Sequence, residues 1–250
     1  MSKEINVLLY GNDDAIGPIA TTLNSLVINT ERYVNAIVLC RNWSHSAIET
    51  DCYSVEFIEY YGHKDTPLYK QSSANDVLYI LPMLREWDRC ILLEWDQIVV
   101  DNIDEYYDVE FSGDEIITAT PYQSGRFVDL WPWKKQKQNL VNLFDNETLN
   151  YPGFDGGSHV IDLKKYNEKR LFLEMERALF RLNGEDHLAK IGVFHPYVKH
   201  VDSIYNMFPE KDNSDTAKII HYNGPNKPWS RKRMKEEKWK EYEVSWDVMR

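Results

Sequence analysis

The chain has 250 residues, 43% of them hydrophobic, and a formal net charge of -11 at pH 7. This length suits one large α/β domain and is short for two independent ones. Because a uniformly acidic protein has no general attraction for a polyanion, we expect no nucleic-acid partner, and a phosphate-bearing ligand must be met by local cations, backbone N–H groups or a metal.

The first hundred residues alternate between expected strands and helices. Apolar runs predict strands at residues 5–10, 35–40, 54–59, 90–93 and 98–100. Helical spacing of apolar residues predicts helices at residues 16–29 and 72–84. This alternation predicts a mostly parallel sheet covered on both faces. Ligands of such sheets bind beyond the carboxyl ends of the strands. Four carboxylates fall there: Asp13, Asp14, Glu94 and Asp96.

The second half of the chain is less regular. Strand-like runs occupy residues 115–120, 160–163 and 218–221, and a helix is expected at residues 164–182. The sequence contains no internal repeat and no low-complexity linker. We therefore expect one domain over residues 1–230, followed by a basic and aromatic tail at residues 231–250.

In this tail, basic residues alternate with large aromatic ones, among them Trp239, Tyr242 and Trp246. Such a segment can lie on an anionic membrane surface, near a lipid-linked acceptor. A solvated terminal helix explains the pattern equally well. We expect the tail to be peripheral to any chemistry in the domain.

Two carboxylates interrupt an apolar run in the segment Leu92-Leu93-Glu94-Trp95-Asp96. A strand buried on both faces rejects charge, so we place this pair just past the end of the strand. There, alternate residues can converge on a hard cation, which prefers oxygen ligands. A solvated strand end explains the pair without a cation, because acidic doublets are common at strand termini.

The segment from His221 to Trp229 reads His-Tyr-Asn-Gly-Pro-Asn-Lys-Pro-Trp and follows a short apolar strand. The His221 imidazole suits a Mn²⁺ ligand, while the Gly224 N–H and the Lys227 ammonium suit phosphate oxygens. The three groups together indicate a site for a metal-bound diphosphate. The alternative is a surface loop that its two prolines merely stiffen.

Two further motifs offer carboxylates. In Asp155-Gly156-Gly157, small residues before a strand let a sugar lie against the backbone, and Asp155 can accept hydrogen bonds from hydroxyls. A plain Gly-Gly turn is the alternative. In Gly184-Glu185-Asp186, two carboxylates stand at a helix start, where capping alone explains Asp186.

Together these motifs resemble those of glycosyltransferase family 8, the retaining enzymes that include bacterial lipopolysaccharide galactosyltransferases and glycogenin. The family's Asp-x-Asp reads here as Glu94-Trp95-Asp96, its Asn-Ser/Ala-Gly as Asp155-Gly156-Gly157, and its Asp-Gln-Asp as Gly184-Glu185-Asp186. Its His-Tyr-x-Gly-x-x-Lys-Pro-Trp is matched in full from His221 to Trp229. The segment Tyr205-Asn206-Met207-Phe208-Pro209 is similar to its Asn-Phe-x-Pro. The resemblance covers about residues 5 to 229.

The resemblance implies a GT-A fold, a single Rossmann-like domain with a mixed, mostly parallel central sheet. It implies that Mn²⁺, with Mg²⁺ as an alternative, is held by Glu94, Asp96 and His221. It implies contacts with the UDP-sugar donor from Tyr10, Asn12, Asp14, Trp95, Gly224 and Lys227. It implies roles at the donor sugar and in catalysis for Asp155, Glu185 and Asp186. Two carboxylates and an imidazole leave room in an octahedral shell for two phosphate oxygens and a water, which suits Mn²⁺.

Three positions depart from the family's pattern. Glu94 replaces the first Asp of the metal motif and is one methylene longer. The family's Lys or Arg before that motif falls about where Asn75 and Asp76 stand, and its Gln in Asp-Gln-Asp is Glu185. The departures concern metal affinity, binding of the donor phosphates and the charge beside the anomeric carbon.

We therefore expect a retaining hexosyltransferase that moves glucose or galactose from a UDP-sugar to a hydroxyl of a glycan, glycolipid or glycoprotein. Mn²⁺ and Lys227 would stabilise the charge on the departing diphosphate. The alternative is a catalytically weak sugar-nucleotide-binding homologue with an interaction role. A nucleotidyltransferase would need a Gly-rich phosphate loop after the first strand, and Gly11-Asn12-Asp13-Asp14 does not supply one.

The three cysteines, Cys40, Cys52 and Cys90, are an odd number without paired spacing. That favours a reducing compartment over a disulfide framework. No apolar stretch is long enough to span a bilayer, and the first residues lack the apolar core of a signal peptide. We expect a cytoplasmic protein, peripheral to a membrane if the tail binds one.

Overall fold

The structure is a computed structural model, and it describes residues 4–11, 15–41, 45–60, 74–129, 137–209, 214–225, 227–229 and 236–249. The chain divides into two compact units. Unit 1 comprises Met1–Tyr60, Cys90–Val109 and Asp202–Arg250, and unit 2 comprises Tyr61–Arg89 and Glu110–Val201.

Unit 1 is built on a sheet of parallel strands. In spatial order these are β5 (Arg89–Glu94), β1 (Glu4–Tyr10), β2 (Tyr33–Cys40) and β4 (Tyr53–Glu59), with the short β3 (Ile48–Glu49) antiparallel to β4. Val7, Leu8 and Leu9 are fully buried in succession, as expected of a strand covered on both faces. The register sets Tyr10 beside Glu94, so the carboxyl ends of β1 and β5 meet at one edge.

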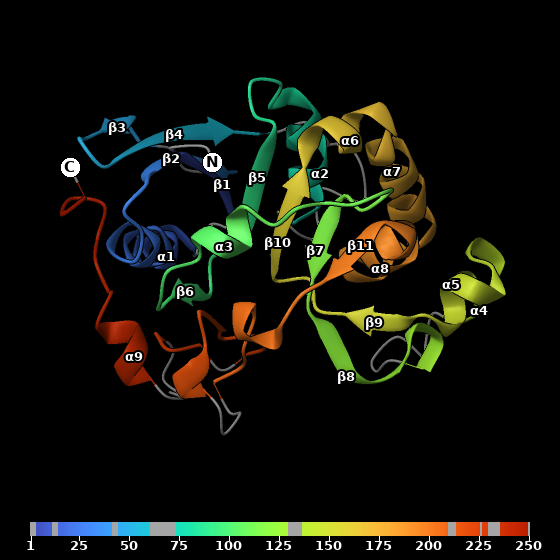
Figure 1. The fold of residues 1–250 in the computed structure, drawn as a ribbon. Coiled ribbons are helices and arrows are strands. Elements are labelled where there is room, and N and C mark those ends of the chain that lie inside the picture. Colours follow the sequence, from blue (N-terminus) through green and yellow to red (C-terminus); the bar gives the residue numbers. More distant parts are fainter. Residues whose placement is uncertain are drawn as a thin grey trace. The chain divides into compact units, whose positions relative to one another are not determined.

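Helix α1 (Ile16–Ile28) covers this sheet, and Figure 1 shows it in dark blue beneath β1 and β2. Its apolar residues at helical spacing, Ile19, Leu23 and Leu26, are fully buried. Just past its end, the Asn29 amide donates to the Ser25 carbonyl at 2.9 Å and to the Val99 carbonyl at 3.0 Å. The end of the helix is thereby fixed to the strand that follows the acidic motif.

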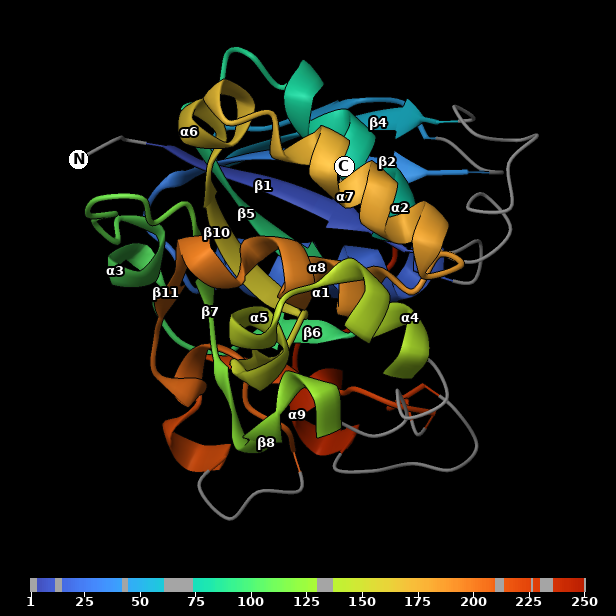
Figure 2. The same ribbon diagram turned by 90° about the vertical axis from the view of Figure 1, so that its right-hand side faces the viewer.

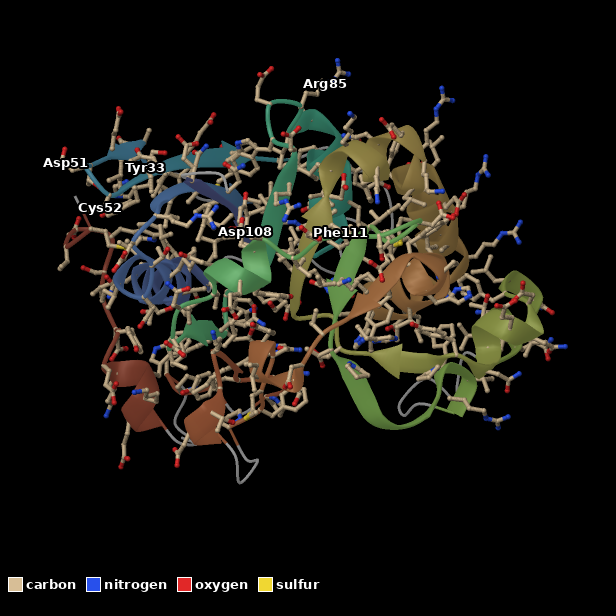
Figure 3. The ribbon with its side chains drawn as sticks, in the orientation of Figure 1. Tyr33, Asp51, Cys52, Arg85, Asp108 and Phe111 are labelled. Atoms are coloured by element: carbon tan, nitrogen blue, oxygen red, sulfur yellow. The ribbon has the colours of Figure 1, made fainter. Side chains whose placement is uncertain are left out.

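The strand that follows the acidic motif is not part of the parallel sheet. The predicted apolar run at residues 98–100 forms β6 (Gln97–Val99), which pairs antiparallel with β12 (Ile219–His221) and places Gln97 opposite His221. The 3-10 turns η6 (Ser203–Tyr205) and η7 (Ser214–Thr216) precede β12. Helix α3 (Asp104–Tyr107) follows β6, and just after it Asp108, labelled in Figure 3, pairs with the Arg32 guanidinium at 3.0 Å.

The C-terminal segment belongs to unit 1. In α9 (Glu236–Lys240) and the residues that follow it, four large side chains are at least 90% buried: Trp239, Tyr242, Trp246 and Met249. The Trp246 indole N–H donates to the Ile16 carbonyl at 2.7 Å, and the Asn24 amide donates to the Tyr242 carbonyl at 2.9 Å. These aromatic side chains are therefore not available to a membrane surface. The predicted membrane contact then rests on the basic side chains of the tail. Of these, Lys238 and Lys240 are exposed, and Arg231, Lys232, Arg233 and Lys235 lie outside the described residues.

Unit 2 contains the remaining strands and most of the helices. Strand β7 (Ile117–Ala119) pairs parallel with β11 (Val198–His200) and antiparallel with β10 (Ser158–Asp162), while β8 (Pro121–Arg126) and β9 (Pro152–Phe154) form a separate antiparallel pair. Its helical elements are α2 (Ala74–Ile80), η2 (Leu81–Met83), η3 (Phe127–Asp129), α4 (Lys137–Leu143), α5 (Asn146–Asn150), α6 (Leu163–Glu168), α7 (Leu171–Arg181), α8 (Asp186–Phe194) and η5 (His195–Tyr197). Figure 2 shows α7 alongside α2, where the Tyr79 hydroxyl donates to the Glu176 carboxylate at 3.2 Å.

The structure corrects two predicted helices. The helix expected at residues 72–84 is described as α2, which ends at Ile80 and continues as a 3-10 turn, because Pro82 cannot donate a helical hydrogen bond. The helix expected at residues 164–182 is two helices, α6 and α7, separated by Arg170 in the left-handed conformation with a φ of 54°. The α/β class with a mostly parallel sheet is confirmed.

The cysteines are three free thiols, Cys40 and Cys90 buried and Cys52 exposed in the turn before β4 (Figure 3). Burial raises the pKa of the Cys40 thiol to about 11, with the Glu59 charge adding to the effect. Among the described residues, none of the helices has the length and apolar character needed to cross a membrane.

Candidate functional site

The acidic motif lies at the turn between β5 and β6. Glu94 is the last residue of β5 and Gln97 the first of β6, so Trp95 and Asp96 form the turn. The Tyr10 hydroxyl donates to Glu94 Oε1 at 2.8 Å. Tyr10 and Glu94 were predicted as donor-binding and metal-binding residues respectively, and the parallel register of β1 and β5 makes them neighbours.

His221 lies at the end of β12, in the C-terminal segment of unit 1, and is next to the same turn because β12 pairs with β6. The Tyr222 N–H donates to the Asp96 carbonyl at 2.9 Å, which fixes the end of β12 to the turn. His221 Nε2 lies 3.2 Å from Glu94 Oε2 and 3.4 Å from Asp96 Oδ1. One ligand atom from each of these three side chains lies within 4.8 Å of the other two.

Asp96 is the most deeply buried carboxylate of this cluster, with 3% of its surface exposed. Burial raises the pKa of the Asp96 carboxyl, but the nearby charges of His221 and Lys227 and the hydrogen bond from Lys227 outweigh burial and hold it below its ordinary value. The carboxylate is therefore ionised at neutral pH. Its Oδ1 atom is buried and has no hydrogen-bond partner among the described residues.

Lys227 lies against the acidic turn. Its ammonium donates to Asp96 Oδ2 and to the Tyr222 carbonyl, the latter at 2.9 Å. It also lies 5.5 Å from the ring centroid of Trp95, within cation–π range. The lysine that the sequence assigns to a diphosphate thus pairs, in this structure, with a predicted metal ligand. Nearby, Gly224 has a φ of 87°, which a residue with a side chain rarely adopts.

Trp95 rests on other aromatic rings. Its ring centroid lies 5.2 Å from that of Trp229, which lies 4.8 Å from that of Trp239. A Cβ on Gly11 would stand 3.1 Å from the Trp95 Cβ and 2.3 Å from the Ala15 Cβ, so only glycine fits there. Asn12 and Asp14, predicted to contact the nucleoside, lie outside the described residues.

Two polar side chains in the core of unit 1 also belong to this site. Gln97 is fully buried and Asn206 is 4% exposed. Gln97 accepts from the Glu94 N–H at 2.9 Å, and Asn206 Oδ1 lies 2.9 Å from His221 Nδ1. Neither residue was assigned a role from the sequence, although Gln97 interrupts an apolar run and Asn206 lies in a segment matched to the family.

The predicted sugar-binding carboxylates lie in unit 2. Asp155 is 4% exposed and accepts from the Gly157 N–H at 3.0 Å. Asp186 begins α8 and lies 3.5 Å from the ammonium of Lys190, which is buried. A Cβ on Gly156 would lie 3.7 Å from that ammonium, so the Gly-Gly turn passes close to it. Glu185 precedes α8 and is exposed.

His159 is a fully buried residue of unit 2 that the sequence analysis did not single out. Burial and the Lys190 charge lower the pKa of its imidazole to about 3, so the ring is neutral at pH 7. Its Nδ1 lies 2.6 Å from the Thr118 carbonyl, which can only accept, so Nδ1 carries the proton. Its Nε2 has no hydrogen-bond partner in the described part of the chain.

Unit 1 thus brings together Glu94, Asp96, His221 and Lys227, with Tyr10 and Trp95 beside them. Unit 2 holds Asp155, Asp186 and Lys190, the last two paired as neighbours one turn apart on α8. Two carboxylates and one imidazole converging in unit 1 can hold a divalent cation. Carboxylate oxygens beside a glycine turn in unit 2 can accept hydrogen bonds from hydroxyl groups.

Comparison with known proteins identifies similar chains. The sequence model described as Glycosyl transferase family 8 matches residues 7–233. A probable galacturonosyltransferase-like 10 of Arabidopsis thaliana is 26% identical over 188 residues, covering 67% of this chain and 49% of the relative. A probable galacturonosyltransferase 13 of the same plant is 23% identical over 176 residues, covering 61% and 32%. The chain therefore spans half or less of the length of these curated relatives.

Solved structures share the fold. The galactosyltransferase LgtC, in complex with donor and acceptor sugar analogues, has a TM-score of 0.73 at 17% identity, and the match covers 95% of each chain. The bifunctional glycosyltransferase WbbM has a TM-score of 0.72 at 17% identity, covering 98% of this chain and 50% of that one. GlyE of Streptococcus pneumoniae TIGR4 has a TM-score of 0.71 at 16% identity, covering 98% and 62%. These likenesses show the GT-A fold.

Proposed function

The chain belongs to glycosyl transferase family 8 and is a glycosyltransferase, and on that premise we propose that it transfers glucose or galactose from a UDP-sugar to an acceptor hydroxyl, with retention of anomeric configuration and with Mn²⁺ as its cation. The acceptor is a glycan, glycolipid or glycoprotein. The three free thiols support a reducing, cytoplasmic location for this activity.

The observation that carries the proposal is the cluster of Glu94, Asp96 and His221. Their ligand atoms lie within 4.8 Å of one another although they come from two distant segments of the chain. Asp96 Oδ1 is buried and has no hydrogen bond among the described residues, which is costly unless a further group binds it. Two carboxylate oxygens and an imidazole nitrogen suit Mn²⁺, so the residues present fit a divalent cation.

In this assignment Glu94, Asp96 and His221 would hold the cation. When bound, the cation supplies a Lewis acid next to the departing diphosphate. Lys227 is the neighbouring protein cation, and its ammonium moves from Asp96 to a phosphate oxygen, where it stabilises the charge of the leaving group. The Gly224 N–H donates to Asn223 Oδ1 at 2.6 Å in this structure, and we assign it to a phosphate oxygen when the donor binds, as a second donor in the same loop.

Tyr10 and Trp95 lie beside the cluster, and we assign them to contacts with the nucleoside. We assign Asn12 and Asp14 to the same contact on the family resemblance. In unit 2, Asp155 and Asp186 hold hydroxyls of the donor sugar. These carboxylates and Glu185 oppose the positive charge that develops on the sugar as the bond to the diphosphate breaks. Lys190, one turn after Asp186, holds the Asp186 carboxylate in place.

The test is a donor screen that measures release of UDP. UDP-glucose, UDP-galactose and UDP-galacturonate are offered with Mn²⁺ and with EDTA. The last donor is included because one relative is named a probable galacturonosyltransferase and another a probable galacturonosyltransferase-like protein. We expect release from a UDP-hexose that vanishes in EDTA and in Asp96→Asn. Asp101→Asn, which changes an exposed carboxylate just after β6, is the matched control and should keep activity.

Release of UDP that persists in EDTA would remove the metal from the proposal. Turnover of UDP-galacturonate alone would replace the hexose with a uronic acid. Tight, Mn²⁺-dependent UDP-hexose binding without turnover under any condition would favour the catalytically weak homologue, which the replacement of the family's Asp by Glu94 motivates.

A further inference from the structure

A short run of buried polar groups leads from the backbone of the acidic turn to the imidazole of His221. The Glu94 N–H donates to Gln97 Oε1 at 2.9 Å. Gln97 Nε2 donates to Asn206 Oδ1 at 3.2 Å, and Asn206 Oδ1 lies 2.9 Å from His221 Nδ1. All three side chains are at most 4% exposed.

The direction of these hydrogen bonds follows from their first member. A backbone N–H can only donate, so the Gln97 atom facing Glu94 is its oxygen, and the Gln97 atom facing Asn206 is its NH₂ group. The Asn206 atom that receives this NH₂ group is therefore its oxygen. Because the same oxygen faces His221 Nδ1, that nitrogen carries the proton.

The consequence falls on the other ring nitrogen. With the proton on Nδ1, neutral His221 has its lone pair on Nε2, the nitrogen that lies 3.2 Å from Glu94 Oε2 and 3.4 Å from Asp96 Oδ1. The opposite tautomer would present an N–H to the cluster and could not ligate a cation there. The Met207 carbonyl accepts from the His221 N–H at 2.8 Å, which holds Asn206 next to β12.

We propose that Gln97 and Asn206 are positioning residues that set the tautomer of His221 and so make its Nε2 a metal ligand. This inference rests on the proposed function, because it concerns the same cation. It goes beyond the motif residues, since the hydrogen bonds that carry it reach the Glu94 backbone and the far ring nitrogen of His221. Partners that fix the far nitrogen of a ligating histidine typically change metal affinity about 10- to 100-fold when removed.

The first test reads the tautomer without any variant. The ¹⁵N shifts of the histidine rings, with the His221 signal identified by its loss in His221→Gln, should show Nδ1 protonated and Nε2 unprotonated in the neutral ring. A neutral ring protonated on Nε2 would overturn the proposal, whatever the enzyme does with a sugar donor.

The second test measures Mn²⁺ affinity in the presence of UDP, by the electron paramagnetic resonance signal of free Mn²⁺. Asn206→Leu should lose about 10- to 100-fold in affinity, and Gln97→Leu should lose less, because Asn206 remains. Asn206→Asp should retain most of the affinity, because a carboxylate still accepts from Nδ1. Asn35→Leu removes another amide of unit 1, one that bonds Asn6 and not this run, and should bind Mn²⁺ like wild type.

The outcomes separate the two proposals. If wild-type protein binds Mn²⁺ and Asn206→Leu binds it equally well at an unchanged thermal midpoint, the positioning role is wrong while the metal site stands. If Asn206→Asp loses as much affinity as Asn206→Leu, the acceptor at Nδ1 is not what matters and the role is again wrong. Failure of wild-type protein to bind Mn²⁺ with UDP would instead defeat the proposed function itself.

Discussion

At the scale of single residues, the site of unit 1 is a balance of charges. Asp96 is buried, ionised and paired with the Lys227 ammonium, with His221 next to it. A second cation entering the cluster competes with Lys227 for the same carboxylate. Lys227 should therefore have opposite effects on two affinities, opposing the binding of Mn²⁺ alone and favouring the binding of the UDP-sugar.

Lys227→Ala should therefore weaken UDP-hexose binding and strengthen the binding of Mn²⁺ alone. Charge-assisted hydrogen bonds are worth about 1.5–3 kcal/mol, which corresponds to roughly a 10- to 150-fold loss of UDP affinity. Titration calorimetry with each ligand separately measures both effects, and Lys238→Ala, an exposed lysine of α9, is the control. A sharp fall in thermal midpoint with unchanged UDP affinity would identify Lys227 as structural instead.

His159 makes the stability of the protein depend on pH. The pKa of the His159 imidazole is lowered from 6.5 to about 3 on folding. Between pH 3 and pH 6.5 the imidazole is therefore mostly protonated in the unfolded chain and mostly neutral in the folded chain. Stability contributed by this group is complete above pH 6.5 and is lost as pH falls towards 3. From pH 7 to pH 5 the free energy of unfolding should drop by about 2 kcal/mol from this group.

Urea unfolding at the two pH values measures that drop. His159→Gln, which keeps a donor for the Thr118 carbonyl, should remove most of it. A variant whose free energy of unfolding falls between pH 7 and pH 5 as steeply as that of wild type would show that another group is responsible.

At the scale of elements, the C-terminal segment supports the acidic turn. Trp239 of α9 contacts Trp229, Trp229 contacts Trp95, and Trp95 lies between the two predicted metal carboxylates in the chain. From the sequence, this segment is expected to be peripheral to donor binding. Because Trp239 packs on Trp229 and Trp229 on Trp95, we expect the C-terminal segment to hold Trp95 in place at the donor site.

Trp239→Ala should both destabilise the protein, by about 3–5 kcal/mol, and weaken UDP binding, by about 1 kcal/mol or roughly fivefold. Trp246→Ala is the matched control, because Trp246 is buried in the same segment but packs against Phe57. It should cost similar stability and leave UDP affinity unchanged. Both variants are measured at a temperature where circular dichroism shows them folded. Equal UDP affinity in the two variants would contradict a special role for Trp239.

At the scale of the whole molecule, the cation and the nucleotide should bind cooperatively. Three protein ligands leave a divalent cation incompletely coordinated, and a diphosphate completes the shell. Mn²⁺ alone should therefore bind weakly, and Mn²⁺ and UDP should each increase the affinity for the other by the same factor. Thermal melting should show a larger shift with both ligands than the sum of the two separate shifts.

Asp96→Asn and His221→Ala should lose this extra shift and keep the rest of the fold. Leu93→Ala, by contrast, removes core packing beside the same turn and should lower the melting temperature while the extra shift remains. If the Mn²⁺ affinity of wild type proves independent of UDP, the shared site is refuted.

Much of this protein was predictable from local pattern. Apolar runs placed β1, β2, β4 and β5, because parallel strands covered on both faces leave no room for charge. The same rule placed Glu94 and Asp96 at a strand end, where Glu94 is the last residue of β5 and Asp96 lies in the turn after it. The metal and phosphate chemistry that the segment from His221 to Trp229 indicates stays a prediction. Each of these inferences needs only a short window of sequence, since hydrophobic periodicity and motif spacing are local properties.

Other features depend on contacts between residues far apart in the chain, and only the tertiary structure decided them. The hydrogen bond between Gln97 and Asn206 joins residues 109 positions apart in the sequence, and that between Lys227 and Asp96 joins residues 131 positions apart. The aromatic residues of the tail looked exposed in the sequence, but unit 1 offers them a core to pack into. Sequence periodicity records which side of an element is apolar, whereas the partner of a buried polar group is set by how the strands are ordered and registered, and that ordering is a property of the folded chain.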